Sequence, residues 1–561
     1  MNMKKIKYSI LSMALLVALA CEQVPIVPID PCEADPASCE EAPACPADAS
    51  AGTASFTKFV AIGNSFVAGV QGGALFTTGQ NNSLAAILNK QFECVGAPAT
   101  FNQPTIGASL GWNLFITQPF LADNTKPILG RMLLQYGTNV SCATGAPSPK
   151  PTPQAYTAGV LEALPNPTAN PGFMYTGSKT ELNNFAVPAV TLGQLLTPAA
   201  GNWGNPNPAV GFSPFYGRFA SNPGTSTIIG DAAAAGGSFF MFWAGLDDFF
   251  LHAAFGADPT KAPLTASATF NAYYNAALNS TSGLLASNAN LKGVLLNYPN
   301  IWKMPHFTSV TYNPIPLTAD QAAAATAGFA SFNGLLDAIS ANTALMTNFG
   351  LDATDLQARK FTFSASCTNK IMLNDESLTD LGPVLDYLRS IGQISSDAQR
   401  AGLAPYEQAR QSTPSDIIPL GAGSILGTAG PGGTTYGVSF PVGDQYVIIP
   451  SEKTEIDNAR TAFNTTVANF ASANSTRVAV ADIDAALNSL ITSQVAVYNN
   501  VTITPNINPP TGIYSEDGAH FNSRGYAFIS RAVISAINTK FSANIPLTSL
   551  AKYSATGLPI P

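Results

Sequence analysis

The chain has 561 residues, of which only 11% are charged and 46% are hydrophobic, with 46 glycines and 42 prolines. This composition is too apolar for a disordered chain and too rich in turn-forming residues for a helical bundle, so it indicates a loop-rich globular protein with an ample core. The formal net charge of −8, with lysine and arginine scattered along the chain, argues against nucleic acid as a partner.

The N-terminus is expected to be a targeting segment and not part of the fold. Three lysines precede an apolar run over residues 10–19, which is too short to span a bilayer. The run ends in Ala20-Cys21, and small residues before a cysteine resemble the cleavage box of a bacterial lipoprotein. The resemblance predicts a signal peptide over residues 1–20 and lipidation of Cys21, for example by palmitate. Cleavage as an ordinary secretory signal is the alternative.

Residues 21–54 are expected to form a tether, because their prolines favour extended, semi-rigid backbone. All charged residues of this stretch are acidic, which resembles the surface-export signals of Bacteroidota lipoproteins. That resemblance implies a surface-exposed protein of the cell envelope, lipid-anchored to the outer membrane; a solvated spacer is the alternative. Without Cys21 six cysteines remain, an even number that permits three disulfides in an exported protein and leaves their pairing open. No Cys-x-x-Cys pair or His cluster suggests a zinc site.

The first element of the fold is predicted at an apolar run over residues 59–62, which is typical of a strand buried on both faces in a parallel sheet. The run stops at Gly63-Asn64-Ser65, a tight turn that leaves a serine hydroxyl at the carboxyl end of the strand. Open α/β sheets bind ligands at this end. Ser65 is therefore a candidate nucleophile, although Gly-Asn-Ser is also an ordinary turn.

Predicted helices and strands alternate along the rest of the chain. A helix is expected over residues 84–92, and the Pro-, Gly- and Thr-rich residues 93–180 indicate functional loops or a lid. Further strands are expected over residues 183–187, 238–244, 294–298 and 478–481. Further helices are expected over residues 190–196, 270–285, 320–339 and 451–470, with a last one around 529–537. Such alternation implies right-handed crossovers and a parallel sheet.

The far end of the chain supplies the partners that a nucleophilic serine needs. Serine is a weak nucleophile at neutral pH, so it requires a neighbouring base, and the base requires an orienting group. Among the three histidines only His520 follows a carboxylate, Asp517, by three residues. This spacing lets Asp517 reach one ring nitrogen while the other faces the serine. Asp482, at the end of a predicted strand, is the alternative acid, and His252 and His306 are expected to be hydrogen-bonded loop or core residues.

Ser65, Asp517 and His520 together resemble the SGNH (GDSL-type) esterases and lipases. The first block of that family is a strand ending in Gly-Asp-Ser, and its last block is Asp-x-x-His. The resemblance runs from about residue 55 to 545 and carries no motif in the long stretches between the blocks.

The chain departs from the family pattern at three positions. Asn64 replaces the usual aspartate of the first block. Residues 184–189 resemble the second block, but Ala189 stands where the family has an oxyanion-hole glycine. Residues 243–248 resemble the third block, but Asp247 stands where the family has asparagine.

The resemblance implies a flavodoxin-like three-layer α/β/α sandwich with a parallel sheet, the SGNH hydrolase fold. The domain would span residues 55–545, with long loop-rich insertions around residues 93–180 and 340–450. Residues 546–561 would form a C-terminal tail. Its substrate specificity would reside in the insertions, which carry no recognisable motif.

The function that the resemblance implies is a lipid-anchored serine hydrolase that cleaves carboxylic esters through an acyl-enzyme. Ser65 would attack, His520 would carry the proton, and Asp517 would orient His520. The backbone N–H groups of Ser65 and Ala189, with the side chain of Asp247, would hold the oxyanion. No metal or organic cofactor is implied, and acyl lipids, acetylated glycans and simple esters all remain open as substrates. The alternative is a catalytically decayed surface lipoprotein on the same fold that binds a ligand or glycan.

Asp247 carries the most consequential departure. Asparagine would donate an N–H to the oxyanion, whereas an ionised aspartate donates nothing and repels negative charge. Asp247 could be protonated, with its pKa raised by burial and by Asp248, and so donate an O–H. A rim position is expected to be partly wet, however, so the sequence favours a charged Asp247 and slow turnover. Asp247 and Asp248 could also form the acid pair of a glycosidase, but adjacent side chains on an extended chain point to opposite sides.

Overall fold

The computed structural model describes residues 45–107, 111–113, 129–140, 142, 147–155, 174–207 and 210–556. The predicted signal peptide, the lipidation site Cys21 and the first part of the predicted tether lie outside these residues. The described residues all belong to one structural unit. The end of the predicted tether packs on this unit, since the Ser50 N–H donates to the Asn544 carbonyl and the Thr53 N–H to the Phe541 carbonyl.

Four parallel strands form the central sheet, in the order β1-β6-β7-β12. Their bounds are β1 (Phe59–Gly63), β6 (Phe239–Trp243), β7 (Lys292–Leu296) and β12 (Val478–Ala481). Every residue of β1 and β6 is buried, as expected for strands covered on both faces. The register places Gly63 opposite Trp243, so both strands deliver the following turns to one edge of the sheet. The predicted α/β fold with a parallel sheet is confirmed.

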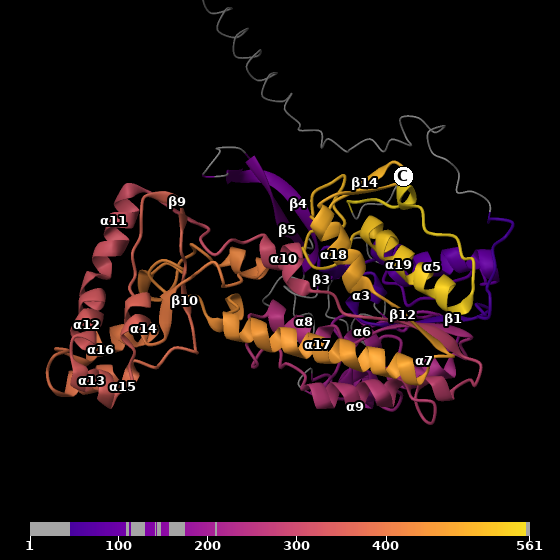
Figure 1. Cartoon of the computed structure of the whole chain (residues 1–561), viewed down its shortest axis with the longest axis horizontal. Helices are drawn as coiled ribbons and strands as arrows, with labels where there is room; N and C mark the ends of the chain where they lie inside the picture. Colours follow the sequence, from indigo (N-terminus) through magenta and orange to yellow (C-terminus); the bar gives the residue numbers. More distant parts are fainter. Residues whose placement is uncertain are drawn as a thin grey trace, which may run out of the picture. The chain divides into compact units, whose positions relative to one another are not determined.

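Helices cover both faces of the sheet (Figure 1), with α19 beside α5 on one face and α17 beside α9 on the other. Their bounds are α3 (Ser65–Ala68), α4 (Thr77–Asn81), α5 (Leu84–Phe92), α6 (Pro214–Gly217), α7 (Ile228–Ala234), α8 (Asp247–Ala254), α9 (Ser267–Leu278), α10 (Pro305–Thr308), α17 (Pro450–Ala473), α18 (Ile483–Ser493) and α19 (Ser523–Phe541). Polar caps begin several of them: the Ser83 hydroxyl accepts from Ala86 N–H, and the Asn522 side chain from Gly525 N–H.

Residues 183–187, predicted as a strand, run beside β1 without forming a full strand. Ala61 N–H donates to the Asn183 carbonyl, and the N–H groups of Phe185 and Val187 donate to the Ala61 and Gly63 carbonyls. This extended segment brings Ala189 to the carboxyl end of β1. The turn that follows contains only a short 3-10 helix, η4 (Gly193–Leu196), where an α-helix was expected to begin.

The stretch of residues 93–180, predicted to lack regular structure, contains an antiparallel hairpin of β4 (Leu129–Val140) and β5 (Pro147–Ala155). The prediction that this stretch lacks regular structure is wrong for the hairpin, because proline normally interrupts a strand and β5 contains four prolines. They occupy alternate positions of β5, so their missing N–H groups all lie along one edge of the strand. The other short strands are β2 (Ala74–Leu75), β3 (Trp112–Asn113), β13 (Ala496–Tyr498) and β14 (Val501–Ile503).

A large insertion, residues 310–449, builds hydrophobic cores of its own, and we call it the insertion lobe. Its elements are β8 (Ile315–Leu317), α11 (Ala319–Gly328), α12 (Ala330–Ser340), α13 (Thr343–Asn348), α14 (Ala353–Ala358), β9 (Ser366–Asn369), β10 (Met372–Asn374), α15 (Gly382–Ser390), α16 (Asp397–Leu403) and β11 (Ala409–Gln411). The lobe therefore starts before the predicted residue 340. The single helix expected over residues 320–339 is two helices that meet at Phe329.

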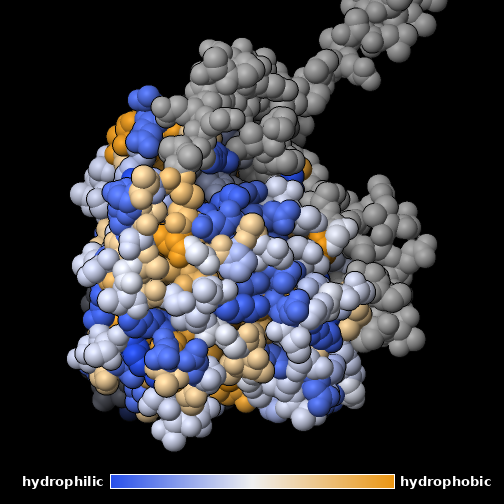
Figure 2. Space-filling view, turned by 90° about the vertical axis from the view of Figure 1, so that its right-hand side faces the viewer, coloured by the Kyte–Doolittle hydropathy of each residue, from blue (hydrophilic) through white to orange (hydrophobic). Residues whose placement is uncertain are grey.

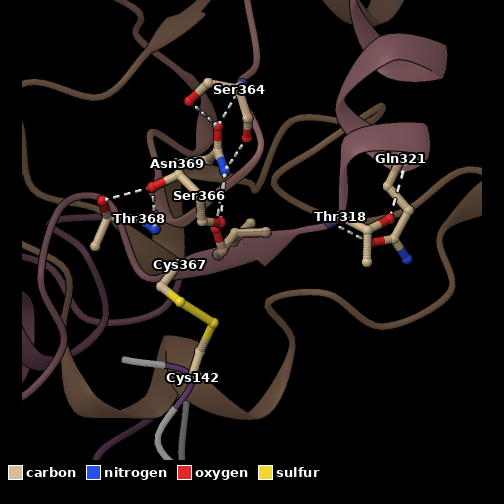
Figure 3. Close-up of a disulfide and its surroundings, with 9 residues drawn as sticks. Cys142, Thr318, Gln321, Ser364, Ser366, Cys367, Thr368 and Asn369 are labelled. Atoms are coloured by element: carbon tan, nitrogen blue, oxygen red, sulfur yellow. Dashed lines mark hydrogen bonds between the residues drawn. A yellow bond between two sulfur atoms is a disulfide. The ribbon is translucent and has the colours of Figure 1, made fainter. Parts of the chain in front are cut away.

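Two disulfides join distant parts of the chain. Cys45 pairs with Cys94 and ties the N-terminal segment to the residues after α5. Cys142 pairs with Cys367 of β9 and ties the β4–β5 hairpin to the insertion lobe (Figure 3). The three remaining cysteines, Cys21, Cys32 and Cys39, lie outside the described residues.

The C-terminal segment after α19 is docked on the domain, where the sequence suggested a tail. Arg524 N–H donates to the Ser554 carbonyl, and the Asn522 amide donates to the Ala555 carbonyl. Among the described residues, no helix has the length and apolar character needed to cross a bilayer. The face seen in Figure 2 carries small groups of hydrophobic residues separated by hydrophilic ones.

Candidate active site

Ser65 opens α3 directly after β1. The Asn64 side chain accepts from Phe66 N–H at 3.2 Å, which caps this short helix and fixes the turn. Ala189 N–H donates to Ser65 Oγ at 2.8 Å. The Ser65 side chain is almost fully buried, with 2% of its surface exposed. The turn thus holds a hydroxyl at the carboxyl edge of the sheet, with a backbone donor already beside it.

Asp517 and His520 form a buried pair just before α19. His520 Nδ1 lies 2.8 Å from Asp517 Oδ2. The other carboxylate oxygen accepts from the N–H groups of Ala519 and His520, each at 2.8 Å. Burial acts to raise the pKa of Asp517, but the His520 charge and these hydrogen bonds outweigh it and hold the pKa below its usual value. The carboxylate therefore only accepts, which places the ring proton on Nδ1 and leaves Nε2 as the basic nitrogen.

Several contacts join the loop after Ser65 to the loop of Asp517 and His520. Gly73 N–H donates to Asp517 Oδ2, and the Tyr526 hydroxyl donates to the Val70 carbonyl at 2.7 Å. The Phe66 ring packs on the His520 ring, with centroids 4.6 Å apart. Segments far apart in sequence therefore meet, and the residue next to Ser65 touches His520.

Ala189 adopts φ +53°, the left-handed region that favours glycine. In this conformation its N–H points at Ser65 Oγ. The side chain is thus accommodated without loss of the donor, at a cost of about 1–2 kcal/mol in backbone strain. Among the predicted oxyanion groups, this N–H is the one with direct contact to the serine.

Asp247, the first residue of α8, is only 3% exposed. Burial, followed by the neighbouring Asp248, raises its pKa well above the usual value, while the Asn64 amide acts in the opposite direction. Asp247 Oδ2 and Asn64 Nδ2 are both buried without a hydrogen bond. The expectation of a partly wet Asp247 is therefore wrong, because the residue is buried, and the raised pKa favours the protonated acid.

The alternatives weighed from the sequence have structural roles. Asp248 accepts from Leu192 N–H and from the Thr265 hydroxyl, both at 2.7 Å. Burial raises its pKa to about 7 against these bonds. Asp482 caps α18 and is not the acid that His520 contacts. His252 Nδ1 lies 2.6 Å from the Ala262 carbonyl.

His306, the second residue of α10, supports the Asp517 loop from behind. Its backbone N–H donates to the Gly518 carbonyl at 2.9 Å, and its ring Nδ1 lies 3.0 Å from the Asp517 carbonyl. Gly518 has φ +71°, and a side chain there would meet the His306 backbone nitrogen at 2.6 Å. Burial lowers the pKa of His306, so the ring is neutral and Nδ1–H donates.

Sequence reasoning missed three of these supporting groups. Phe66 and Gly73 both follow Ser65 closely in the sequence. The paired glycines Gly72 and Gly73 after the first block were therefore an available signal. His306 offered none, because its partner is a backbone carbonyl 211 residues away.

Among the described residues, one group of three carboxylates is close enough together to hold a cation. It consists of Glu376, Asp444 and Glu452, whose oxygens lie within 4.8 Å of one another. Burial, and then the two neighbouring acids, raise the pKa of Glu452 to about 9. A shared proton satisfies such a cluster as well as a metal does.

Neighbouring loops thus carry a hydroxyl with a backbone donor and an imidazole–carboxylate pair, which are groups that nucleophilic acyl transfer uses. Comparisons with protein-family models, with curated proteins and with solved structures each found no match.

Proposed function

We propose that the chain is an exported, lipid-anchored serine hydrolase that cleaves carboxylic esters, built on the three-layer α/β/α SGNH fold. The observation that carries the proposal is the buried Asp517–His520 pair, with Nδ1 and Oδ2 2.8 Å apart, in contact with the residue beside Ser65. An imidazole that is hydrogen-bonded to a carboxylate, and that contacts the residue beside a serine at the carboxyl edge of a parallel sheet, supports activation of that serine.

In the proposed reaction Ser65 Oγ attacks the ester carbonyl while His520 Nε2 takes its proton. The negative charge on the carbonyl oxygen is stabilised by the N–H groups of Ser65 and Ala189 and by the O–H of Asp247. His520 returns the proton to the leaving alcohol, and an acyl-enzyme remains on Ser65. Water activated by His520 then releases the acid, and Asp517 holds the imidazolium in place throughout.

The second candidate is a binding protein on the same fold without turnover, anchored at the outer membrane. The observation that favours it is the burial of the Ser65 side chain, of which 2% is exposed. The substrate must reach this hydroxyl for the first proposal to hold, whereas a binding module has no such requirement.

A panel of p-nitrophenyl esters from C2 to C16, hydrolysed by the wild type, Ser65→Ala and His520→Ala, separates the two candidates. The hydrolase predicts turnover that both substitutions abolish. Absence of turnover for every ester, or turnover that survives Ser65→Ala, would reject it. Anchoring is tested separately by incorporation of labelled palmitate, which Cys21→Ser is expected to abolish.

A further inference from the structure

The insertion lobe contains a cavity of about 780 Å³. Its wall is built by the residues that follow α10, by β8, by α11, by η10 (Leu420–Ser424) and by residues 435–439. Pockets of 300–1,000 Å³ bury most of a drug-sized ligand. The volume is therefore sufficient for a small-molecule site.

The chemistry of the wall is uniform. Among the described residues that line the cavity, none carries a charged or titratable side chain. Apolar side chains such as Ile315, Leu426 and Val438 alternate with hydroxyls such as Thr435. The Gln321 side-chain oxygen accepts from Thr318 N–H at the start of α11 (Figure 3). Several lining residues, such as Ser309, Gln321 and Gly423, are exposed, so the site is open to solvent on one side, and its uncharged inner wall favours a neutral, largely apolar ligand.

One turn of α10 connects the cavity to the candidate triad. His306 in α10 bonds the carbonyl of Asp517, and Ser309, which lines the cavity, lies one helical turn further on. Ser309 N–H donates to the Pro305 carbonyl, which continues the turn of the helix. η10, from the opposite wall, packs against α10.

A second link runs through the β4–β5 hairpin. Met132 N–H donates to the Gly72 carbonyl at 2.7 Å, next to the Gly73 N–H that bonds Asp517. At its far end the Cys142–Cys367 disulfide holds β9, the strand that pairs with β8 in the cavity wall (Figure 3). Two separate structures thus fix the cavity wall to the loops of the candidate triad.

From this combination we propose that the lobe cavity binds the acyl chain of a neutral ester, which makes the substrate an acyl lipid with a chain of medium or greater length rather than an acetylated glycan. The proposal rests on the hydrolase function proposed above. An acetyl group has no chain to occupy a cavity that lies beyond α10, whereas each methylene of a longer chain that enters an apolar site improves binding ~4-fold.

The test uses Ala325→Phe, which fills the cavity from α11, and Val438→Phe, which fills it from the other wall. Ala323→Phe on the same helix is the matched control, since Ala323 does not line the cavity. The first measurement is fluorescence titration of a neutral monoacylglycerol, pyrene-labelled at the chain end, into each variant in the Ser65→Ala background. The second is the ratio of kcat/KM for p-nitrophenyl decanoate to that for p-nitrophenyl acetate.

Both filling substitutions are expected to weaken probe binding and to lower the ratio about tenfold or more, the effect of excluding two or more methylenes, while Ala323→Phe has no effect. Thermal melts identify a variant that does not fold. If one filling variant does not fold, the other still tests the proposal. Equal probe binding by the filling variants and the control, or no probe binding by any protein, overturns the cavity proposal. Probe binding without hydrolysis of any ester overturns the hydrolase instead and leaves the cavity assigned.

Discussion

Replacement of Asp247 by asparagine is the perturbation that tests the electrostatics of the site most sharply. The acid is 3% exposed, and burial with the nearby Asp248 raises its pKa well above 3.8. The raised pKa favours the protonated acid, which offers an O–H, and the amide introduced by Asp247→Asn would offer an N–H in its place. We expect Asp247→Asn to hydrolyse esters at neutral pH within a few-fold of the wild-type rate.

The two proteins diverge as the pH rises. Ionisation of Asp247 removes the donor and places a negative charge beside the developing oxyanion, and loss of one such donor costs about 10²- to 10³-fold in kcat. The wild-type rate should thus fall by that factor on the alkaline limb, while Asp247→Asn retains its rate, because an amide does not ionise.

The free energy of unfolding should also depend on the protonation of Asp247. The folded-state pKa lies above the unfolded value of 3.8. The native state therefore binds the proton more tightly, and its contribution to stability is fully present below pH 3.8 and is lost as the pH rises through the folded pKa. The free energy of unfolding of Asp247→Asn should lack this decline.

The assay is kcat for p-nitrophenyl butyrate between about pH 5 and about pH 9, with urea unfolding at the same pH values. Asp482→Asn is the matched control, because aspartate and asparagine can each cap α18 at this position. If Asp247→Asn raises kcat about 10²-fold at neutral pH, Asp247 is charged there and the argument from burial fails. An unchanged alkaline limb would show instead that its ionisation does not govern the rate.

Two further substitutions test the neighbouring supports. Ala189→Gly should raise the free energy of unfolding by about 1 kcal/mol with activity retained, because relief of the strain at φ +53° exceeds the entropy lost by glycine. Urea unfolding measures this change, and the control Ala186→Gly should be destabilising. A loss of stability in Ala189→Gly would contradict the strain. His306→Ala should lower kcat on the order of 10- to 10²-fold with little change in KM, since the Asp517 loop loses its support. His306→Asn, whose side-chain N–H can replace Nδ1–H, should restore most of the rate, and equal loss in both variants would leave His306 a packing role only.

The parts of the fold that the sequence predicts are those encoded locally. Continuous apolar runs such as residues 239–243 mark buried strands, and the three-residue spacing of Asp517 and His520 brings their side chains into contact. The lobe was unreadable because its elements are short and its cores join residues from many of them. The burial of Asp247 was also beyond local reasoning, since the sequence around it does not show that the start of α8 lies in the core. His306 reaches Asp517 through a backbone carbonyl, which no side-chain motif records.

The most direct test of the central claim is covalent trapping with a fluorophosphonate, followed by mass spectrometry of the intact chain and of its peptides. An activated serine attacks the phosphorus and keeps the adduct, whereas an ordinary serine does not react. The account predicts a single adduct on Ser65, absent from Ser65→Ala and strongly reduced in His520→Ala. No adduct on the folded wild type, or an adduct on another serine, would contradict it.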